Sequence, residues 1–287
     1  MKRAELVEEK HAKLSVRKQC KLLHVSRSNL YYERVPEKAE DRAAMKTMDK
    51  IYTEDPCLGT RKLVTVLERD HGLKMNRKHI QRLRRSMGLE TIWCQPRHMR
   101  TSCPDATHRK YPYLLRGFVS RHADQVWASD ITYIPMGQGH AFLCAVMDWH
   151  TRCVLGWAIS NTMDAALVHE ALDMAHSNCG KVPEIFNTDQ GSQFTSPQWT
   201  GRLEKMGIRV SMDGKGRWMD NVFVERLWRS LKHEEVYLKS YQTVGEARTS
   251  IGRWIERYNT WRPHAELCNR TPAQAYREER GNKRTAA

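Results

Sequence analysis

The stretch that most constrains the fold of this chain is residues 126–135, Val-Trp-Ala-Ser-Asp-Ile-Thr-Tyr-Ile-Pro. Its β-branched and aromatic residues predict a strand of a packed sheet, yet Asp130 stands at its centre. A charged carboxylate inside such a strand is costly unless a cation or a hydrogen-bond donor lies beside it. Asp130 is therefore a candidate site residue, although on its own it could be a solvated residue of an edge strand.

Two further acids follow at suggestive positions. Residues 184–189 form a short apolar run that ends at Asp189, directly before the turn sequence Gln-Gly-Ser. Thirty-five residues, positions 190 to 224, then separate Asp189 from Glu225. Each acid alone has an ordinary explanation, a turn for Asp189 and a solvated helix face for Glu225. Asp220, just before the second of these, is predicted to cap a helix, with metal ligation as an alternative.

The segment 219–235 around Glu225 is amphipathic. Phe223, Leu227 and Leu231 recur every four residues and predict a helix with one apolar face. A separate stripe of the same helix carries three charged residues, Glu225, Arg229 and Lys232. An acid beside two cations suits a site where a divalent metal meets phosphate oxygens, whereas a plain ion pair would contribute only about 0.3–0.5 kcal/mol.

Three carboxylates from a strand, a strand end and a helix could together hold two hard divalent cations. Such a pair activates the attacking oxygen and stabilises the leaving oxygen of an in-line phosphoryl transfer. The sequence thus favours a metal-dependent phosphoryl-transfer enzyme.

The segments around these acids resemble the catalytic motifs of bacterial insertion-sequence transposases. The motifs are residues 127–133 (Trp-Ala-Ser-Asp-Ile-Thr-Tyr), 187–194 (Asn-Thr-Asp-Gln-Gly-Ser-Gln-Phe) and 220–232. They are similar to those of the second-frame (OrfB) subunit of the insertion sequence three family, which is related to retroviral integrases. Many relatives have His-Ser where this chain has Asn187 and Thr188, so no role of that His is carried over.

The resemblance implies a ribonuclease H-like core, with a mixed five-stranded sheet and flanking helices, in an α+β or α/β fold. It implies that Asp130, Asp189 and Glu225 are the catalytic residues and metal ligands, with Lys232 as the basic residue seven positions after the Glu. The expected cofactor is Mg²⁺ or Mn²⁺, with two ions in the active site.

The implied activity is DNA transposition through nicking of the 3′ end and strand transfer, with joining of the element's ends into a circle before integration. The implied partners are DNA, further copies of the chain, and an upstream-frame subunit or frameshift fusion. Two alternatives stay open: a DNA-binding regulator or inactive transposase remnant, and a ribonuclease H-like nuclease.

The charge of the chain points to the same class of partner. Forty-eight Lys and Arg against thirty-three Asp and Glu give a net charge of +15 and a pI near 9.6, which favours nucleic acid. The sequence has neither an apolar run of 18 residues nor a signal peptide, and predicts a cytoplasmic, nucleoid-associated protein without membrane contact. The eight cysteines include no C-x-x-C pair, and no structural zinc is expected.

The chain is predicted to contain two helical DNA-binding segments before the core. A helix-turn-helix-like segment covers 1–35, where Ser26 caps a second helix and Arg27, Ser28 and Asn29 begin it. A second such domain covers 36–89, where a basic helix from 77 to 87 offers DNA contacts through Arg77, Lys78, Arg82 and Arg85. A solvated basic face is the alternative for that helix.

The rest of the chain is divided by composition and periodicity. A basic linker covers 90–123, the catalytic core 124–240, a C-terminal helical extension 241–277 and a charged, disordered tail 278–287. In the core, strands are expected at 126–135, 140–148, 153–160, 184–189 and 208–212, with helices at 164–177, 197–206 and 219–235. A Gly-rich segment between the last strand and helix carries two candidate DNA-binding residues, Lys215 and Arg217.

Overall fold

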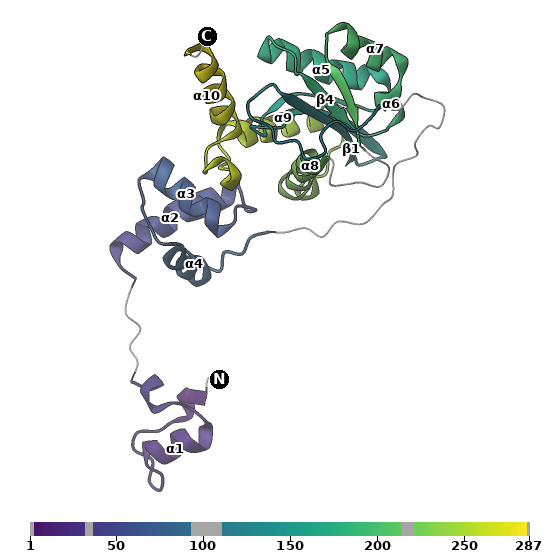
Figure 1. Cartoon of the computed structure of the whole chain (residues 1–287). Coiled ribbons are helices and arrows are strands. Elements are labelled where there is room, and N and C mark those ends of the chain that lie inside the picture. Colours follow the sequence, from purple (N-terminus) through teal and green to yellow (C-terminus); the bar gives the residue numbers. More distant parts are fainter. Residues whose placement is uncertain (1–2, 32–36, 93–110, 214–220, 286–287) are drawn as a thin grey trace. The chain divides into compact units, whose positions relative to one another are not determined.

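The computed structural model describes residues 3–31, 37–92, 111–213 and 221–285 (Figure 1). The chain divides into two compact units, Met1–Thr47 and Met48–Ala287. No helix in the described ranges is long and apolar enough to cross a lipid bilayer.

The first unit contains less helix than the sequence predicts. Its elements are two 3₁₀ turns, η1 (Arg3–Leu6) and η2 (Arg27–Asn29), helix α1 (Val16–Leu23) and the beginning of α2 (Ala39–Glu54). The prediction of a second α-helix that Ser26 caps is wrong, since the 3₁₀ turn η2 follows Ser26. The Ser26 hydroxyl lies 2.7 Å from that of Ser28 and caps no helix. Within residues 3–31 this segment therefore has one α-helix, where a helix-turn-helix has two.

Two amphipathic helices near the start of the second unit form a small core. They are α3 (Thr60–His71) and α4 (Arg77–Ser86). The Asn76 side chain accepts the backbone N–H of Lys78 at 2.9 Å, which is an N-cap, and Gly72 ends α3 in the left-handed region with φ of 66°. The facing apolar residues are Leu63, Val66, Leu67, Ile80 and Leu83, all buried.

A mixed five-stranded sheet forms the centre of the second unit (Figure 1). Its order is β3 (Val154–Ser160), β2 (His140–Asp148), β1 (Val126–Pro135), β4 (Ile185–Thr188) and β5 (Arg209–Met212). The pairs β1–β2 and β2–β3 are antiparallel, while β1–β4 and β4–β5 are parallel. The predicted mixed sheet with flanking helices is confirmed, with the strand bounds shifted by no more than one residue at either end.

Helices cover both faces of this sheet. Helices α5 (Ala165–Cys179), α6 (Ser192–Thr195) and α7 (Pro197–Lys205) cover one face, and α8 (Val222–Glu234) and α9 (Val244–Thr260) cover the other. Since side chains alternate along a strand, Trp127 packs with α5 and α7 while Ala128 packs with α8 and α9. Asp130 has the parity of Ala128 and so belongs to the α8 face.

The tail predicted to be disordered from Glu278 is helical instead. Helix α10 spans Pro272–Thr285. It begins with a reciprocal cap, in which the backbone N–H of Thr271 donates to the Gln274 side chain and the backbone N–H of Gln274 donates to the Thr271 hydroxyl. The Tyr276 hydroxyl then donates to Asp124 at 2.6 Å.

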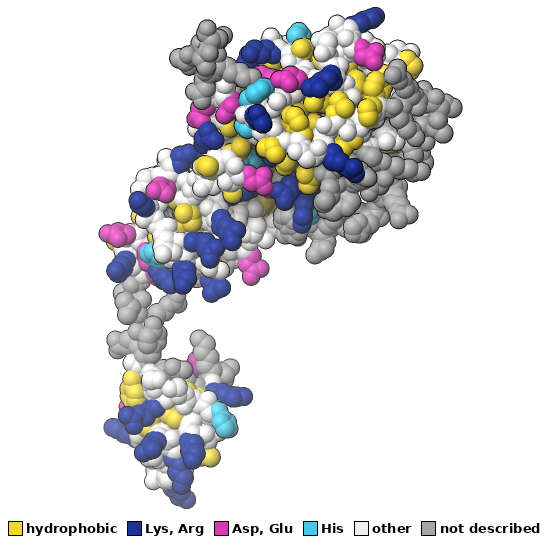
Figure 2. Space-filling view, viewed as in Figure 1, with side chains coloured by type: hydrophobic (Ala, Val, Ile, Leu, Met, Phe, Trp, Pro, Cys, Tyr) yellow, Lys and Arg dark blue, Asp and Glu magenta, His cyan; other side chains and the backbone are white. Residues whose placement is uncertain are grey.

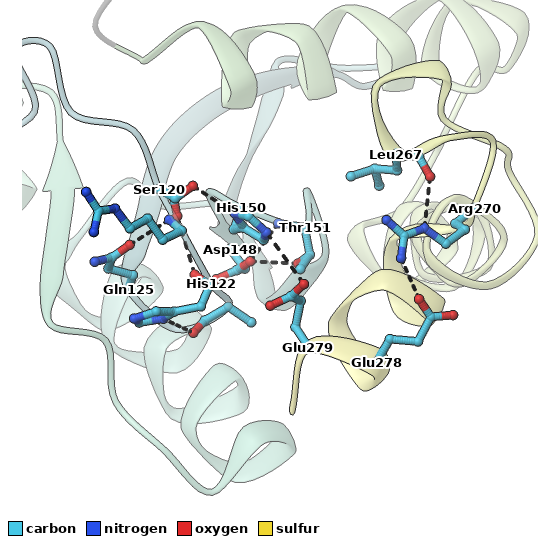
Figure 3. A network of polar contacts seen from close by, with 12 residues as sticks. Ser120, His122, Gln125, Asp148, His150, Thr151, Leu267, Arg270, Glu278 and Glu279 are labelled. Carbon is cyan, nitrogen blue, oxygen red and sulfur yellow. Dashed lines mark hydrogen bonds and ion pairs between the residues drawn. The ribbon is translucent and has the colours of Figure 1, made fainter. Parts of the chain in front are cut away.

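A polar network joins α10 to the loop that follows β2 (Figure 3). His150 contacts the backbone oxygen of Ser120 at 3.1 Å and lies 3.9 Å from Glu279. Beneath it, the fully buried Asp148 accepts the backbone N–H of Thr151 at 2.8 Å and its hydroxyl at 2.6 Å. These tertiary contacts make the charged C-terminal segment part of the folded domain, which its composition does not reveal.

Packing against the core begins before residue 124. In the described part of the predicted linker, Leu115 is buried against Val126 and Ile185. Residues 93–110, most of the predicted linker, lie outside the described ranges.

Candidate active site

The sheet register brings Asp130 and Asp189 to the same level. In the parallel pair β1–β4, Ala128 lies opposite Asn187. Asp130 and Asp189 each follow their paired residue by two positions, and the charge of Asp189 acts on Asp130. Asp189 immediately follows the last residue of β4, Thr188, where the chain leaves the sheet.

Hydrogen bonds hold the Asp130 carboxylate toward α8. Its Oδ1 accepts the backbone N–H of Ile131 at 2.8 Å, and its Oδ2 accepts the indole N–H of Trp228 at 2.9 Å. Trp228 was not predicted as a site residue. Its spacing of three residues from Glu225 on one helix was the available signal, because residues three apart share a helix face.

Helix α8 presents Glu225 beside that contact. Val224, Leu227 and Leu231 are buried against the sheet, while Glu225 is exposed in the first turn. The helix start is fixed by Asn221, whose side-chain N–H donates to the backbone oxygen of Ser129 at 3.3 Å. The strand that carries Asp130 is therefore bonded to α8 on both sides of Glu225.

The pKa of each of the three acids is raised, and that of Asp130 responds to the charges of the other two. Burial, then the charge of Asp189, raises the pKa of Asp130 to about 7, with a smaller contribution from Glu225. Burial also raises the pKa of Asp189, against the stabilising 2.9 Å hydrogen bond from the backbone N–H of Gly191. Burial alone raises the pKa of Glu225. A shared group of disfavoured negative charges is what a divalent cation would relieve.

The donor set fits hard cations, which prefer carboxylate oxygens. Across the described ranges, no three His, Cys, Asp or Glu side chains already converge as ligands on one point. Each oxygen of Asp130 accepts one hydrogen bond, from Ile131 or Trp228, and so keeps a lone pair for a cation. The Gly191 N–H bonds Oδ1 of Asp189. We therefore treat Asp130, Asp189 and Glu225 as the residues that would hold the metal.

A network of hydrogen bonds lies on both sides of Asp189 in the sequence. Asn187, fully buried, donates from its side chain to Asp213 at 2.8 Å and accepts the Ser211 hydroxyl at 2.8 Å. Gln190 donates to the backbone oxygen of Asp213 at 2.7 Å. The residue that stands where many relatives have His thus links β4 to β5 and fixes the strand end that carries the acid.

The predicted DNA-binding residues fall into separate places. Lys232 is half-buried near Asp130, whose charge opposes the lowering of the Lys232 pKa by burial. Arg229 is exposed on α8, and four exposed cations line α4: Arg77, Lys78, Arg82 and Arg85. In Figure 2, Lys and Arg side chains gather over the region that α3 and α4 occupy in Figure 1.

The remaining predicted residues are not brought to the acids by any described contact. Arg27 and Ser28 are exposed in η2 of the first unit, and Asn29 ends that turn. Lys215, Arg217 and the alternative ligand Asp220 lie outside the described residues.

The raised pKa of Asp130 predicts how stability depends on pH without metal. Between pH 4 and pH 7 the unfolded chain releases a proton that folded Asp130 retains, so the free energy of unfolding should fall as pH rises. Asp130→Asn removes this penalty. In EDTA, the stability of the variant relative to the parent should increase by about 1–3 kcal/mol from pH 4 to pH 8, measured by urea unfolding. A difference that is constant with pH would show that Asp130 titrates normally.

The chain matches known families along most of its length. Residues 120–217 and 206–272 match profiles described as integrase core domain, and residues 38–97 match an HTH-like domain. The chain is 31% identical over 214 residues to the transposase for insertion sequence element IS904 of Lactococcus lactis subsp. lactis (strain IL1403), which covers 73% of this chain and 83% of the relative.

Two further matches are one relative and one solved structure. The chain is 35% identical over 164 residues to transposase InsF for insertion sequence IS3A of Escherichia coli (strain K12), covering 56% of this chain and 57% of that protein. Among solved structures, the HTLV-2 integrase catalytic core domain in complex with magnesium is 17% identical, with a TM-score of 0.42, over 54% of this chain and 97% of that one.

Proposed function

Because the chain belongs to the insertion sequence three (IS3) family of transposases, as an OrfB-type catalytic subunit with an integrase-like core, we propose that Asp130, Asp189 and Glu225 carry its phosphoryl-transfer chemistry on DNA. The observation that supports this assignment best is the parallel register of β1 and β4, which levels the two aspartates below a helix that presents Glu225.

The three carboxylates would hold Mg²⁺ or Mn²⁺, two ions in one site. When bound, such ions activate the attacking oxygen and stabilise the leaving oxygen of an in-line transfer. Trp228 and the N–H of Ile131 keep the Asp130 carboxylate oriented, and Gly191 does the same for Asp189. Lys232, close to Asp130, would contact the phosphate oxygens of the DNA.

The reaction has two steps at one site. Water first cuts the phosphodiester at the 3′ end of the element and frees a 3′-hydroxyl. That hydroxyl then attacks another DNA phosphate, so one phosphodiester bond forms as another breaks, and no external energy source is required. Two DNA ends must meet for this chemistry, which supports a homo-oligomer on DNA. We further propose that the protein acts in the cytoplasm, at the nucleoid, with an upstream-frame subunit or as a frameshift fusion.

Strand transfer on a labelled duplex with the element's end tests the proposal. The chain, alone and with the upstream subunit, is assayed with Mg²⁺ or Mn²⁺ beside Glu225→Gln and the control Glu256→Gln, which makes the same change at an exposed helical position. Joined products should require metal and disappear only in Glu225→Gln.

Other outcomes identify other functions. Joining that persists in Glu225→Gln would contradict the assignment of the three acids. Binding to the ends without cutting would favour a regulator or inactive remnant, and cleavage confined to RNA·DNA hybrids would favour a ribonuclease H-like nuclease.

A further inference from the structure

A cavity of about 720 Å³ lies between the start of α3, the start of α4 and the outer face of α8. We call it the basic cavity, because six of its lining side chains are cationic and one is acidic. The cations are Arg61, Lys62, Arg77, Arg226, Arg229 and Arg262; the acid is Glu234. All of them belong to the second compact unit.

The acids nearby neutralise only part of this charge. Glu234 pairs with Arg262, and Arg226 lies 3.1 Å from Glu266. Within the part of the chain that the structure describes, Arg61, Lys62 and Arg77 form no ion pair. The cavity therefore keeps a positive charge that an anion would balance.

The N-terminus of α3 adds backbone donors to the same place. Its N-cap is Gly59, which has no side chain to accept a hydrogen bond, and its first turn contains no acid. Gly59, Thr60, Arg61 and Lys62 all line the cavity. The first N–H groups of a helix have no partner within the helix, and a phosphate is a suitable acceptor for them.

The environment of Lys62 is that of an unbalanced cation. Burial, and then the neighbouring Arg262, lowers the pKa of Lys62 to about 7, although Asp55 partly opposes this. A lysine in these surroundings is stabilised as the charged form when an anion binds beside it.

The cavity adjoins the candidate active site through α8. Arg226 follows Glu225 directly, and Arg229 lies one turn farther along the same helix. A ligand that contacts both arginines therefore runs beside Glu225. The cavity is wider than one phosphate group requires, which suits consecutive groups of a sugar-phosphate backbone.

We propose that the basic cavity binds backbone phosphates of the DNA whose cleaved phosphate lies at Asp130, Asp189 and Glu225. In this arrangement one DNA segment contacts both the α3–α4 pair and the catalytic core. The distance between the basic cavity and the three acids then sets how far the cleaved phosphate lies from the bound phosphates. The inference rests on the proposed function, since it takes DNA as the substrate.

The test measures DNA binding without chemistry. The affinity of the full chain for a labelled duplex is determined by fluorescence anisotropy in EDTA over a range of salt concentrations, for the parent and for Arg61→Gln/Arg77→Gln. Both residues are exposed, so the variant should fold. The control Lys205→Gln/Arg209→Gln removes the same charge from exposed positions that line none of the described cavities.

Loss of two phosphate contacts should reduce the slope of log K against log salt by about 2 and lower the affinity several-fold at 0.1–0.2 M salt. The control should leave the slope unchanged. Equal effects of the two variants, or no effect of Arg61→Gln/Arg77→Gln, would overturn the proposal. In either case binding by the parent would leave the proposed function standing, whereas a parent that does not bind DNA would contradict both.

Inorganic phosphate distinguishes a free anion from a DNA backbone. At matched ionic strength, inorganic phosphate should raise the unfolding temperatures of the parent and of Arg61→Gln/Arg77→Gln by the same amount. The duplex should raise the unfolding temperature of the parent more than that of the variant. A rise with millimolar phosphate and none with DNA would assign the cavity to a free phosphate and overturn the proposal.

Discussion

Strand transfer should fall by at least about a thousand-fold when Asp189 is replaced by Asn, because the amide keeps the size of the side chain and loses the charge that holds a divalent cation. The 2.9 Å hydrogen bond from the N–H of Gly191 can be retained by the amide oxygen, so the turn after β4 should remain. DNA affinity measured in EDTA should change by less than about three-fold, since no phosphate contact is removed.

The same position can report whether the side chain is a metal ligand. Asp189→Cys should be inactive with Mg²⁺ and regain part of its activity with Zn²⁺ or Mn²⁺, because thiolates prefer softer cations than carboxylates do. Asp173→Asn is the matched control: this residue is exposed in α5 and pairs with Arg202, and its loss should leave the rate within about two-fold. Equal activity of Asp189→Asn and the control would remove Asp189 from the site.

Arg262→Met should destabilise the second unit by about 3–5 kcal/mol, because it leaves the carboxylate of Glu234 without its partner at a position that is largely buried from solvent. The two side chains are only 12% and 11% exposed. Burial lowers the pKa of Arg262 to about 10, so its guanidinium stays charged at neutral pH. The change in the free energy of unfolding is measured by urea titration monitored by circular dichroism.

Two variants make the Arg262 prediction specific. Arg262→Met/Glu234→Leu removes both charges and should recover most of the loss, as replacement of a whole buried pair usually does. Arg226→Met breaks the exposed pair with Glu266, where the side chains are 67% and 60% exposed, and should cost no more than about 1 kcal/mol. A cost for Arg262→Met as small as that for Arg226→Met would mean that solvent replaces the partner of Glu234.

The residues at the C-terminal end of α9, next to Arg262, also contact α3. The indole of Trp261 donates to Asp70 at 2.9 Å, and its backbone oxygen accepts from Arg69 at 2.9 Å. Arg257 stacks over the same indole with 4.5 Å to the ring centre. Trp261 therefore joins α3 to the end of α9.

Much of the local structure was determined by the sequence, because its signals act within a few residues. The alternation of β1 predicts its bounds and its two faces, and Asn76 marks the start of α4 through a bond to a residue two positions away. The motif spacing around Asp130, Asp189 and Glu225 predicts that the three acids form one site. Local signals failed at Ser26, whose hydroxyl lies against Ser28 instead of capping a helix.

The features that depend on contacts between distant segments appear only in the tertiary structure. The parallel register that levels Asp130 with Asp189 joins strands almost sixty residues apart, and the bond from Trp228 reaches a carboxylate 98 positions earlier. Helix α10 is joined to the core by the hydrogen bond from Tyr276 to Asp124, 152 residues away. Neither periodicity nor propensity encodes such pairings, because burial and its effect on charge arise only when the sheet and its helices pack together.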